Sequence, residues 1–192
     1  MKKGKIFVIS GPSGSGKTTL LEKVLKGKEI RKKFARSVSL TTRPKRTGEA
    51  SGRHYFFVSR EDFKERLKAK KILEWTKYLG YYYATPRDFV EKQLKSGKNI
   101  ALCLDLRGAR QLKRLYPGNT VTVFIAPPSL GELKGRIEGR CKKTKKKEIR
   151  QRLLMARREI RASRHYDYSL LNEDLQQAVK VLKQIILREE NG

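Results

Sequence analysis

The sequence contains little cysteine and no long apolar run. Its two cysteines, Cys103 and Cys141, match no metal-binding spacing, so neither a zinc module nor a disulfide framework is expected. No apolar run approaches the ~20 residues of a membrane-spanning helix. The first such run, Ile6–Ile9, is short and leads into glycines in place of a cleavage site. We therefore expect no signal peptide, no membrane association and a cytoplasmic protein.

Acidic residues are also scarce, because 19 Asp and Glu face 47 Lys and Arg, which gives a net charge of +28. Such a balance favours anionic partners such as nucleotides, nucleic acids or acidic surfaces. The cations are dispersed along the sequence and no nucleic-acid-binding module is recognisable. We therefore expect small anions and not nucleic acid as partners. A generic solvated surface, of the kind found at high temperature, is the alternative explanation of the charge.

Short apolar runs alternate with helical patterns. The runs Ile6–Ile9, Ile100–Leu104 and Val121–Ala126 lack polar alternation, which is typical of parallel strands covered on both faces. Apolar stripes with helical spacing occur at Lys17–Leu25 and at 175–186. The pattern predicts an α/β fold, with a three-layer αβα core around a parallel sheet. Ser129 followed by Glu132 predicts a helix start at that point.

Residues ~35–87 break this alternation, since they are rich in Arg, Thr, Ser and Tyr. Strand-like stretches occur within them at Tyr55–Val58 and Leu73–Tyr78. We expect a small lobe inserted into the core. A second irregular stretch, 136–152, is strongly basic and is expected to lie between two helices.

The segment "GPSGSGKT" fits the phosphate-binding loop pattern G-x-x-x-x-G-K-[ST] in full. It follows a predicted strand and opens a predicted helix, which is the context that the pattern requires. Glycines allow backbone N–H groups to surround phosphate oxygens, and the helix N-terminus favours the same anion. Lys17 is expected to reach the β- and γ-phosphates of ATP, and the Thr18 hydroxyl to ligate Mg²⁺ as cofactor. The predicted ATP-binding residues here are Gly11, Pro12, Ser13, Gly14, Ser15, Gly16, Lys17, Thr18 and Thr19.

Two arginines, Arg43 and Arg46, flank Pro44, which disfavours a helix at this point. On a loop they could form a fork for a second phosphate group. Ordinary surface arginines in an Arg-rich chain are an equally good interpretation of this local pattern.

From Lys5 to about Leu187 the chain resembles guanylate kinases, which transfer the γ-phosphate of ATP to GMP. The resemblance rests on ordered motifs: "GPSGSGKTT", "SVSLTTRPKRTGE", "GRHYFFV", "LEW", "GYYYATP", "DLRGARQLK", "FIAPPS", "RIEGR" and "YDYSLLNEDL". It implies one domain over residues 1–192, with a core at ~1–34, ~88–130 and ~165–192. It also implies a GMP-binding lobe at ~35–87 and a lid at ~131–164.

The resemblance implies a role for each matching residue. The GMP-binding residues would be Ser39, Arg43, Arg46, Tyr55, Glu74, Tyr83, Thr85 and Asp105. Among these, Glu74 would accept hydrogen bonds from guanine N1–H and N2, and the Thr85 hydroxyl would donate to O6. Arg136, Arg140 and Arg152 match lid residues of the family. Arg136 and Arg140 would bind ATP, Arg140 and Arg152 would close over the phosphates, and Asn172 matches a position near the adenine of ATP. The catalytic residues would be Lys17, Arg43, Arg140 and Arg152, with no general base, because the acceptor oxygen is already ionised.

Three positions depart from the family pattern. Cys103 replaces the first of two acids and Arg107 replaces a glutamine, so the pocket should be about two charges more positive and require more Mg²⁺. Ala84 replaces a glycine, which would displace Thr85 if that backbone needs a positive φ. The lysine run at 142–147 replaces an acidic lid segment. It is either a solvated charge run or a device for capturing ATP.

Two alternatives to a GMP kinase remain open from the sequence. One is a guanylate-kinase-like scaffold that binds phosphopeptides without activity, although the intact phosphate loop disfavours it. The other is a kinase for a different phosphorylated small molecule. A monomer or a small homo-oligomer is expected.

Overall fold

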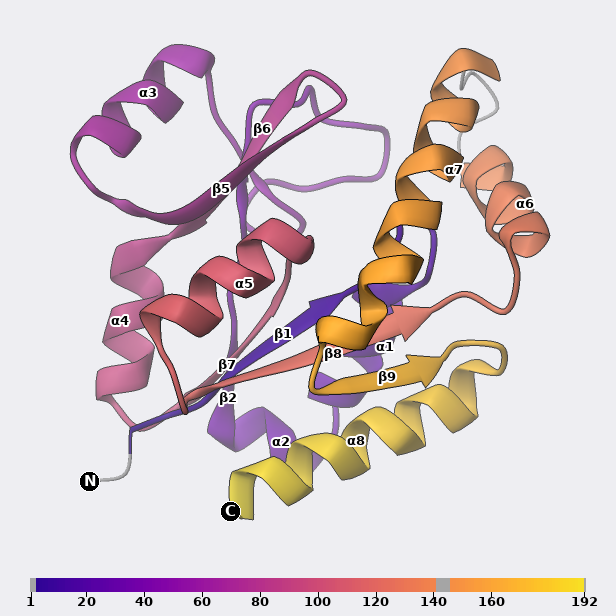
Figure 1. The fold of residues 1–192 in the computed structure, drawn as a ribbon. Helices are drawn as coiled ribbons and strands as arrows, with labels where there is room; N and C mark the ends of the chain where they lie inside the picture. The colour runs from indigo at the N-terminus through magenta and orange to yellow at the C-terminus, as the bar shows by residue number, and fades with distance from the viewer. Residues whose placement is uncertain (1–2, 141–145, 192) are drawn as a thin grey trace.

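The core of the molecule is a five-stranded, entirely parallel sheet in the order β2-β7-β1-β8-β9 (Figure 1). In the computed structural model, which describes residues 3–140 and 146–191, the strands are β2 (Phe34–Arg36), β7 (Asn99–Cys103), β1 (Ile6–Ser10), β8 (Thr120–Ala126) and β9 (Tyr168–Leu171). Three of them coincide with the predicted apolar runs. All five residues of β1 are buried, as expected for a central strand that is covered on both faces.

Helices cover both faces of this sheet and complete three layers. Alternate residues of β1 point to opposite faces, so Phe7 packs with α1 (Lys17–Leu25) and α8 (Leu175–Asn191). Its neighbour Val8 packs with residues of the other layer, which comprises α4 (Arg87–Lys95) and α5 (Leu106–Leu115). The short helix α2 (Lys28–Lys33) follows α1. The predicted three-layer α/β fold is therefore confirmed.

A second, mixed sheet forms the inserted lobe, in the order β4-β3-β6-β5. Its elements are β3 (Leu40–Thr41), β4 (Phe56–Phe57), α3 (Arg60–Lys68), β5 (Ile72–Tyr78) and β6 (Tyr81–Pro86). The two predicted strand-like stretches appear as β4 and β5.

One boundary differs, because residues 34–36 belong to the core sheet as β2 and not to the lobe. The Phe34 ring packs against Phe7, with ring centroids 5.2 Å apart, and this contact holds the segment in the core.

The region predicted to form a lid contains α6 (Leu130–Arg140), α7 (Lys146–Arg161) and the short 3-10 helix η1 (Ala162–His165). The Ser129 hydroxyl accepts a hydrogen bond from the Glu132 backbone N–H at 3.0 Å, so α6 begins where the capping pattern predicts. The stretch 136–152, expected between helices, is helical in its described parts, 136–140 and 146–152. Cys141 and residues 142–145 of the lysine run lie outside the described residues.

Within the described parts of the chain, no helix is long and apolar enough to cross a membrane.

Candidate active site

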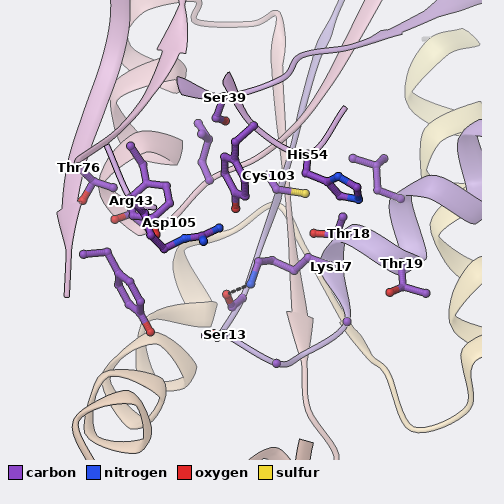
Figure 2. A pocket seen from close by; sticks show the side chains of 18 of the residues that line it. Ser13, Lys17, Thr18, Thr19, Ser39, Arg43, His54, Thr76, Cys103 and Asp105 are labelled. Atoms are coloured by element: carbon purple, nitrogen blue, oxygen red, sulfur yellow. Dashed lines mark hydrogen bonds between the residues drawn. The ribbon is translucent and has the colours of Figure 1, made fainter. Parts of the chain in front are cut away.

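A cavity of about 550 Å³ opens where β1 and β7 end, between the core sheet, the inserted lobe and α7. The carboxyl edge of a parallel sheet is the usual ligand-binding position in open α/β folds. Figure 2 shows Lys17 and Thr18 entering the cavity from the core, and Ser39 and Arg43 entering it from the lobe. The two halves of the predicted site therefore share one cavity.

The loop between β1 and α1 has the conformation that its glycines permit. Gly11, Gly14 and Gly16 have φ angles of 137°, 94° and 90°, which L side chains rarely adopt. A Cβ on Gly11 would lie 2.4 Å from the Ile125 carbonyl oxygen, and one on Gly16 would lie 2.4 Å from the Asn172 Nδ2. Side chains are excluded at these positions, which leaves the backbone N–H groups accessible to an anion.

Lys17 and Asn172 fix the loop from two sides. The Lys17 Nζ donates hydrogen bonds to the carbonyl oxygens of Gly11 and Pro12, at 2.6 and 2.8 Å. The Asn172 amide, which is buried, donates to the Ser15 carbonyl at 2.7 Å. Asn172 thus supports the loop from behind and does not line the cavity.

The arginine pair predicted to bind a second phosphate lies in the lobe wall of the cavity. Arg43 is only 8% exposed, so it is not an ordinary surface arginine. Its Nη2 donates to both carboxylate oxygens of Glu49, at 2.8 and 3.0 Å, and its Nη1 donates to the Pro44 carbonyl at 2.7 Å. Glu49 also accepts the Arg46 backbone N–H at 2.9 Å. Burial alone would raise the pKa of Glu49, but the hydrogen bonds from Arg43 and Arg46 outweigh it and lower that pKa.

Ser39, Tyr55 and Tyr83 line the same wall. The Arg43 guanidinium lies 5.5 Å from the centre of the Tyr55 ring, and the Tyr55 and Tyr83 rings meet edge to face at 5.8 Å. Burial raises the pKa of Tyr55 to about 12, so its hydroxyl stays protonated and can donate a hydrogen bond to an anion. The wall therefore offers hydroxyl and guanidinium donors together.

Glu74 is the most deeply buried carboxylate of the cavity wall, with 2% exposure. The Thr85 hydroxyl, buried beneath it, donates a hydrogen bond to Glu74 Oε1 at 2.6 Å. Burial raises the pKa of Glu74 to about 7; the Thr85 hydrogen bond opposes this shift and the Asp105 charge reinforces it. A Cβ on Gly108 would lie 2.7 Å from Glu74 Oε2, so a larger residue there would displace the carboxylate.

Ala84 leaves this pair undisturbed. It lies in β6, where it pairs with Leu40 and Trp75. Among the described non-glycine residues, only Lys70 and Leu79 have a positive φ. The backbone at Ala84 therefore does not require glycine, and the displacement of Thr85 considered from the sequence does not occur.

Cys103 and Asp105 both line the cavity, as their spacing predicts. The Cys103 sulfur lies beside Lys17 and Thr18 (Figure 2). Burial raises the pKa of the Cys103 thiol against the effects of Lys17 and Arg36, so the thiol is neutral. Asp105 also caps α5, because its Oδ1 accepts the Gly108 N–H at 2.9 Å.

Arg107, in contrast, is exposed on α5 and is not among the residues that line the cavity. The expectation that the pocket gains two positive charges is therefore wrong. The neutral thiol of Cys103, in place of the acid of the family pattern, makes the pocket one charge more positive. Arg107 lies outside the cavity and adds no charge to it.

Helix α7 contributes Arg152 and Glu159 to the cavity. Arg152 is 7% exposed, its Nη2 bonds Glu148 at 2.5 Å, and its Nε has no hydrogen-bond partner among the described residues. Glu159 was not predicted as a cavity residue from the sequence. Its spacing could have indicated it, because Glu159 lies seven residues after Arg152 and residues seven apart on a helix share a face. Burial raises the pKa of Glu159 to about 7, an effect that Lys17 opposes and Asp105 reinforces.

Two predicted lid residues lie elsewhere or are not described. The Arg136 guanidinium donates to the Asn172 carbonyl at 3.3 and 3.4 Å and does not line the cavity. The side chain of Arg140 lies outside the described part of the structure.

A phosphate-binding loop, a second cluster of anion donors and a buried carboxylate around one cavity define a phosphotransferase with two nucleotide sites. Comparison with known proteins agrees. The family model described as guanylate kinase matches residues 3–189. The chain is 42% identical to a guanylate kinase of Bacillus anthracis, over 98% of this chain and 90% of the relative. It is 40% identical to one of Thermotoga maritima, over 97% and 88%.

A solved structure gives the same result. The crystal structure of guanylate kinase from Anaplasma phagocytophilum matches with a TM-score of 0.82 and 31% identity, over 98% of this chain and 87% of that chain. The chain therefore belongs to the guanylate kinase family, and the resemblance inferred from its motifs is confirmed.

Proposed function

We propose that the protein transfers the γ-phosphate of ATP to GMP, giving ADP and GDP. The observation that carries the proposal is the Glu74–Thr85 pair: Glu74 lines the same cavity as Lys17, and the fully buried Thr85 hydroxyl donates to Glu74 from behind. Guanine presents N1–H and an N2 amine side by side, and one carboxylate accepts both. Adenine has no N1–H, and a mismatch in such a site costs a factor of about 10⁴.

The donor half would hold ATP on the loop that carries Lys17 and Thr18. The Lys17 Nζ then exchanges its bonds to the Gly11 and Pro12 carbonyls for phosphate oxygens. The buried Nε of Arg152 supplies a further donor, since it has no partner among the described residues. In this proposal Arg140 keeps its predicted lid role. Asn172 acts by supporting the loop, and Arg136 donates to the Asn172 carbonyl.

The acceptor half would hold the GMP phosphate against Ser39, Arg43, Arg46, Tyr55 and Tyr83. Guanine then lies on Glu74, and the Thr85 hydroxyl turns from Glu74 Oε1 towards guanine O6. Asp105, beside Glu74 in the cavity wall, completes the acceptor side.

The transfer needs no general base, because the attacking oxygen belongs to a phosphate that is ionised near neutral pH. That oxygen bonds to the γ-phosphorus of ATP while the bond to the β–γ bridging oxygen breaks, and ADP leaves. The chain contributes in-line positioning and positive charge from Lys17, Arg43, Arg140 and Arg152.

The oxygen donors of the cavity fit Mg²⁺ brought in with ATP. Among the described residues no group of three or more His, Cys, Asp and Glu could hold a metal ion. This suits Mg²⁺, which is usually held by few protein ligands, water and substrate phosphates. Thr18 would hold it, and when bound it would neutralise charge on the β- and γ-phosphates. A cytoplasmic location belongs to the same proposal.

The test is a coupled assay of ADP release with GMP, dGMP, IMP, AMP and UMP as acceptors. We expect strong turnover with GMP, weaker turnover with dGMP, and little with IMP, which lacks the N2 amine. The Lys17→Met variant serves as the inactive control. Absence of turnover with every acceptor would refute the proposal and favour a phosphopeptide-binding scaffold, and turnover with another acceptor alone would favour a different kinase.

A further inference from the structure

The outward face of α7 carries a row of cations that pair with no acid in the described parts of the chain. With 3.6 residues per turn, Arg152 and Glu159 share the inward face, and the opposite face presents Lys147, Arg150, Arg157, Arg158 and Arg161. We call these five exposed residues the α7 stripe. Figure 1 shows α7 as a long helix beside α6. One face of α7 therefore lines the cavity, and the opposite face is exposed to solvent.

No side chain of the α7 stripe makes an ion pair or a hydrogen bond with a described residue. The two acids of α7, Glu148 and Glu159, both lie on the inward face. Neighbouring α6 differs, because its Lys134 and Arg136 pair with Glu138 and Glu132. Like charges one turn apart on a helix repel each other, so the stripe is left uncompensated by the fold.

The basic surface continues beyond α7. Arg164 in η1 is exposed, and the Lys113–Asp167 ion pair places α5 beside the segment that follows η1. On α5, Arg107, Arg110 and Arg114 are exposed and share one face by their spacing. Exposed cations therefore occur on η1 and on one face of α5 as well as on α7.

We propose that the α7 stripe binds the phosphate backbone of a nucleic acid without reading its bases. Four of its five cations are arginines, whose planar guanidinium matches phosphate oxygens in a bidentate manner. The row is long and straight, which suits a repeating anion better than a single small one. This capacity is separate from phosphate transfer between nucleotides.

A membrane surface fits the α7 stripe less well. Helices that lie in a bilayer interface bury a broad apolar face. On the outward face of α7 the only apolar side chain among the described residues is Leu154, which is 51% exposed.

The experiment titrates labelled single-stranded DNA of about 20 nucleotides, and the matching duplex, with the full-length protein across a salt series. We expect binding whose logarithm falls with the logarithm of salt concentration with a slope of about −0.7 to −0.9 per phosphate contact. The Arg157→Gln/Arg161→Gln variant should bind about tenfold more weakly and reduce the slope by about two contacts. Its kinase activity should be unchanged.

The matched control is Lys92→Gln/Lys95→Gln, which removes the same charge from exposed positions of α4. If this control weakens binding as much, net charge alone is responsible and the proposal is refuted. Absence of binding at low salt, or binding to anionic lipid vesicles but not to nucleic acid, also refutes it. Should the first variant misfold, Arg150→Gln/Arg158→Gln tests the same face.

Discussion

In the proposed function a single residue, Glu74, selects the acceptor. Its carboxylate is almost fully buried and its pKa is raised to about 7, so in the empty protein it is half protonated at neutral pH. A protonated carboxyl cannot accept both guanine hydrogen bonds. Binding of GMP therefore requires Glu74 to lose its proton, which links acceptor affinity to pH.

The affinity for GMP should rise as pH increases towards and past 7. With a pKa of about 7, roughly a tenth of Glu74 is ionised at pH 6 and most of it at pH 8, so Kd should be about tenfold lower at pH 8. Isothermal titration calorimetry in buffers of different ionisation enthalpy measures both Kd and the proton released. Glu74→Gln should weaken GMP binding strongly, abolish this pH dependence and leave ATP binding intact. A Glu159→Gln control should keep the dependence, and a pH-independent wild-type Kd would contradict the assignment.

Cys103 should raise the Mg²⁺ requirement. The thiol is neutral and lies beside Lys17 and Thr18, where a carboxylate would favour a divalent cation. In Cys103→Asp, the Mg²⁺ concentration at half-maximal activity should fall severalfold. Cys103→Ser, which stays neutral and is similar in size, is the control. Identical Mg²⁺ titrations of wild type and Cys103→Asp would show that Cys103 does not affect the Mg²⁺ requirement.

At the residue scale, motif spacing alone identified the phosphate loop and placed Cys103 and Asp105 on one face. The acceptor-side residues followed only from the resemblance to guanylate kinases. The sequence could not reveal Glu49, whose contact with Arg43 depends on how the loop folds back. Nor could it show that Ala84 has an ordinary strand conformation, since φ at one position depends on the whole lobe sheet.

Among the elements, the β1–loop–α1 unit forms the donor half only with help from the other end of the chain. Asn172, which follows β9, donates to the Ser15 carbonyl and lies against Gly16. The apolar runs predicted β1, β7 and β8, because fully buried strands have no polar alternation. The assignment of β2 to the core sheet depends on a packing contact with Phe7, which no local pattern encodes.

Removal of the Asn172 amide should loosen the loop. Asn172→Ala deletes a buried hydrogen bond to Ser15, which should cost about 1–2 kcal/mol of stability and lower Tm by several degrees. It should also weaken ATP binding more than GMP binding. The control is Asn99→Ala, which removes another buried amide, bonded to the Lys5 backbone and remote from the cavity. Equal effects of both variants on ATP affinity would show that Asn172 supports the fold but not the loop.

For the whole molecule, charge is the dominant feature. At most 19 of the 47 cations can be neutralised by side-chain carboxylates, so a large excess remains whatever pairs form. Surface ion pairs each contribute little, and salt weakens them. Repulsion among the excess cations destabilises the compact state, and salt screens this repulsion. Salt thus weakens the ion pairs but also weakens the repulsion. With a net charge of +28 the second effect is larger, so we expect salt to stabilise the folded protein.

Thermal stability should therefore increase with ionic strength. Between low salt and about 0.3 M NaCl, where the Debye length falls below ~8 Å, Tm should rise by several degrees, because 1 kcal/mol corresponds to about 2–4 °C in a chain of this size. Differential scanning calorimetry measures the shift. Sulfate at equal ionic strength should raise Tm further if the phosphate loop binds it, and Lys17→Met should remove that extra increment but keep the general rise. A Tm that falls with NaCl would mean that the ion pairs outweigh the repulsion.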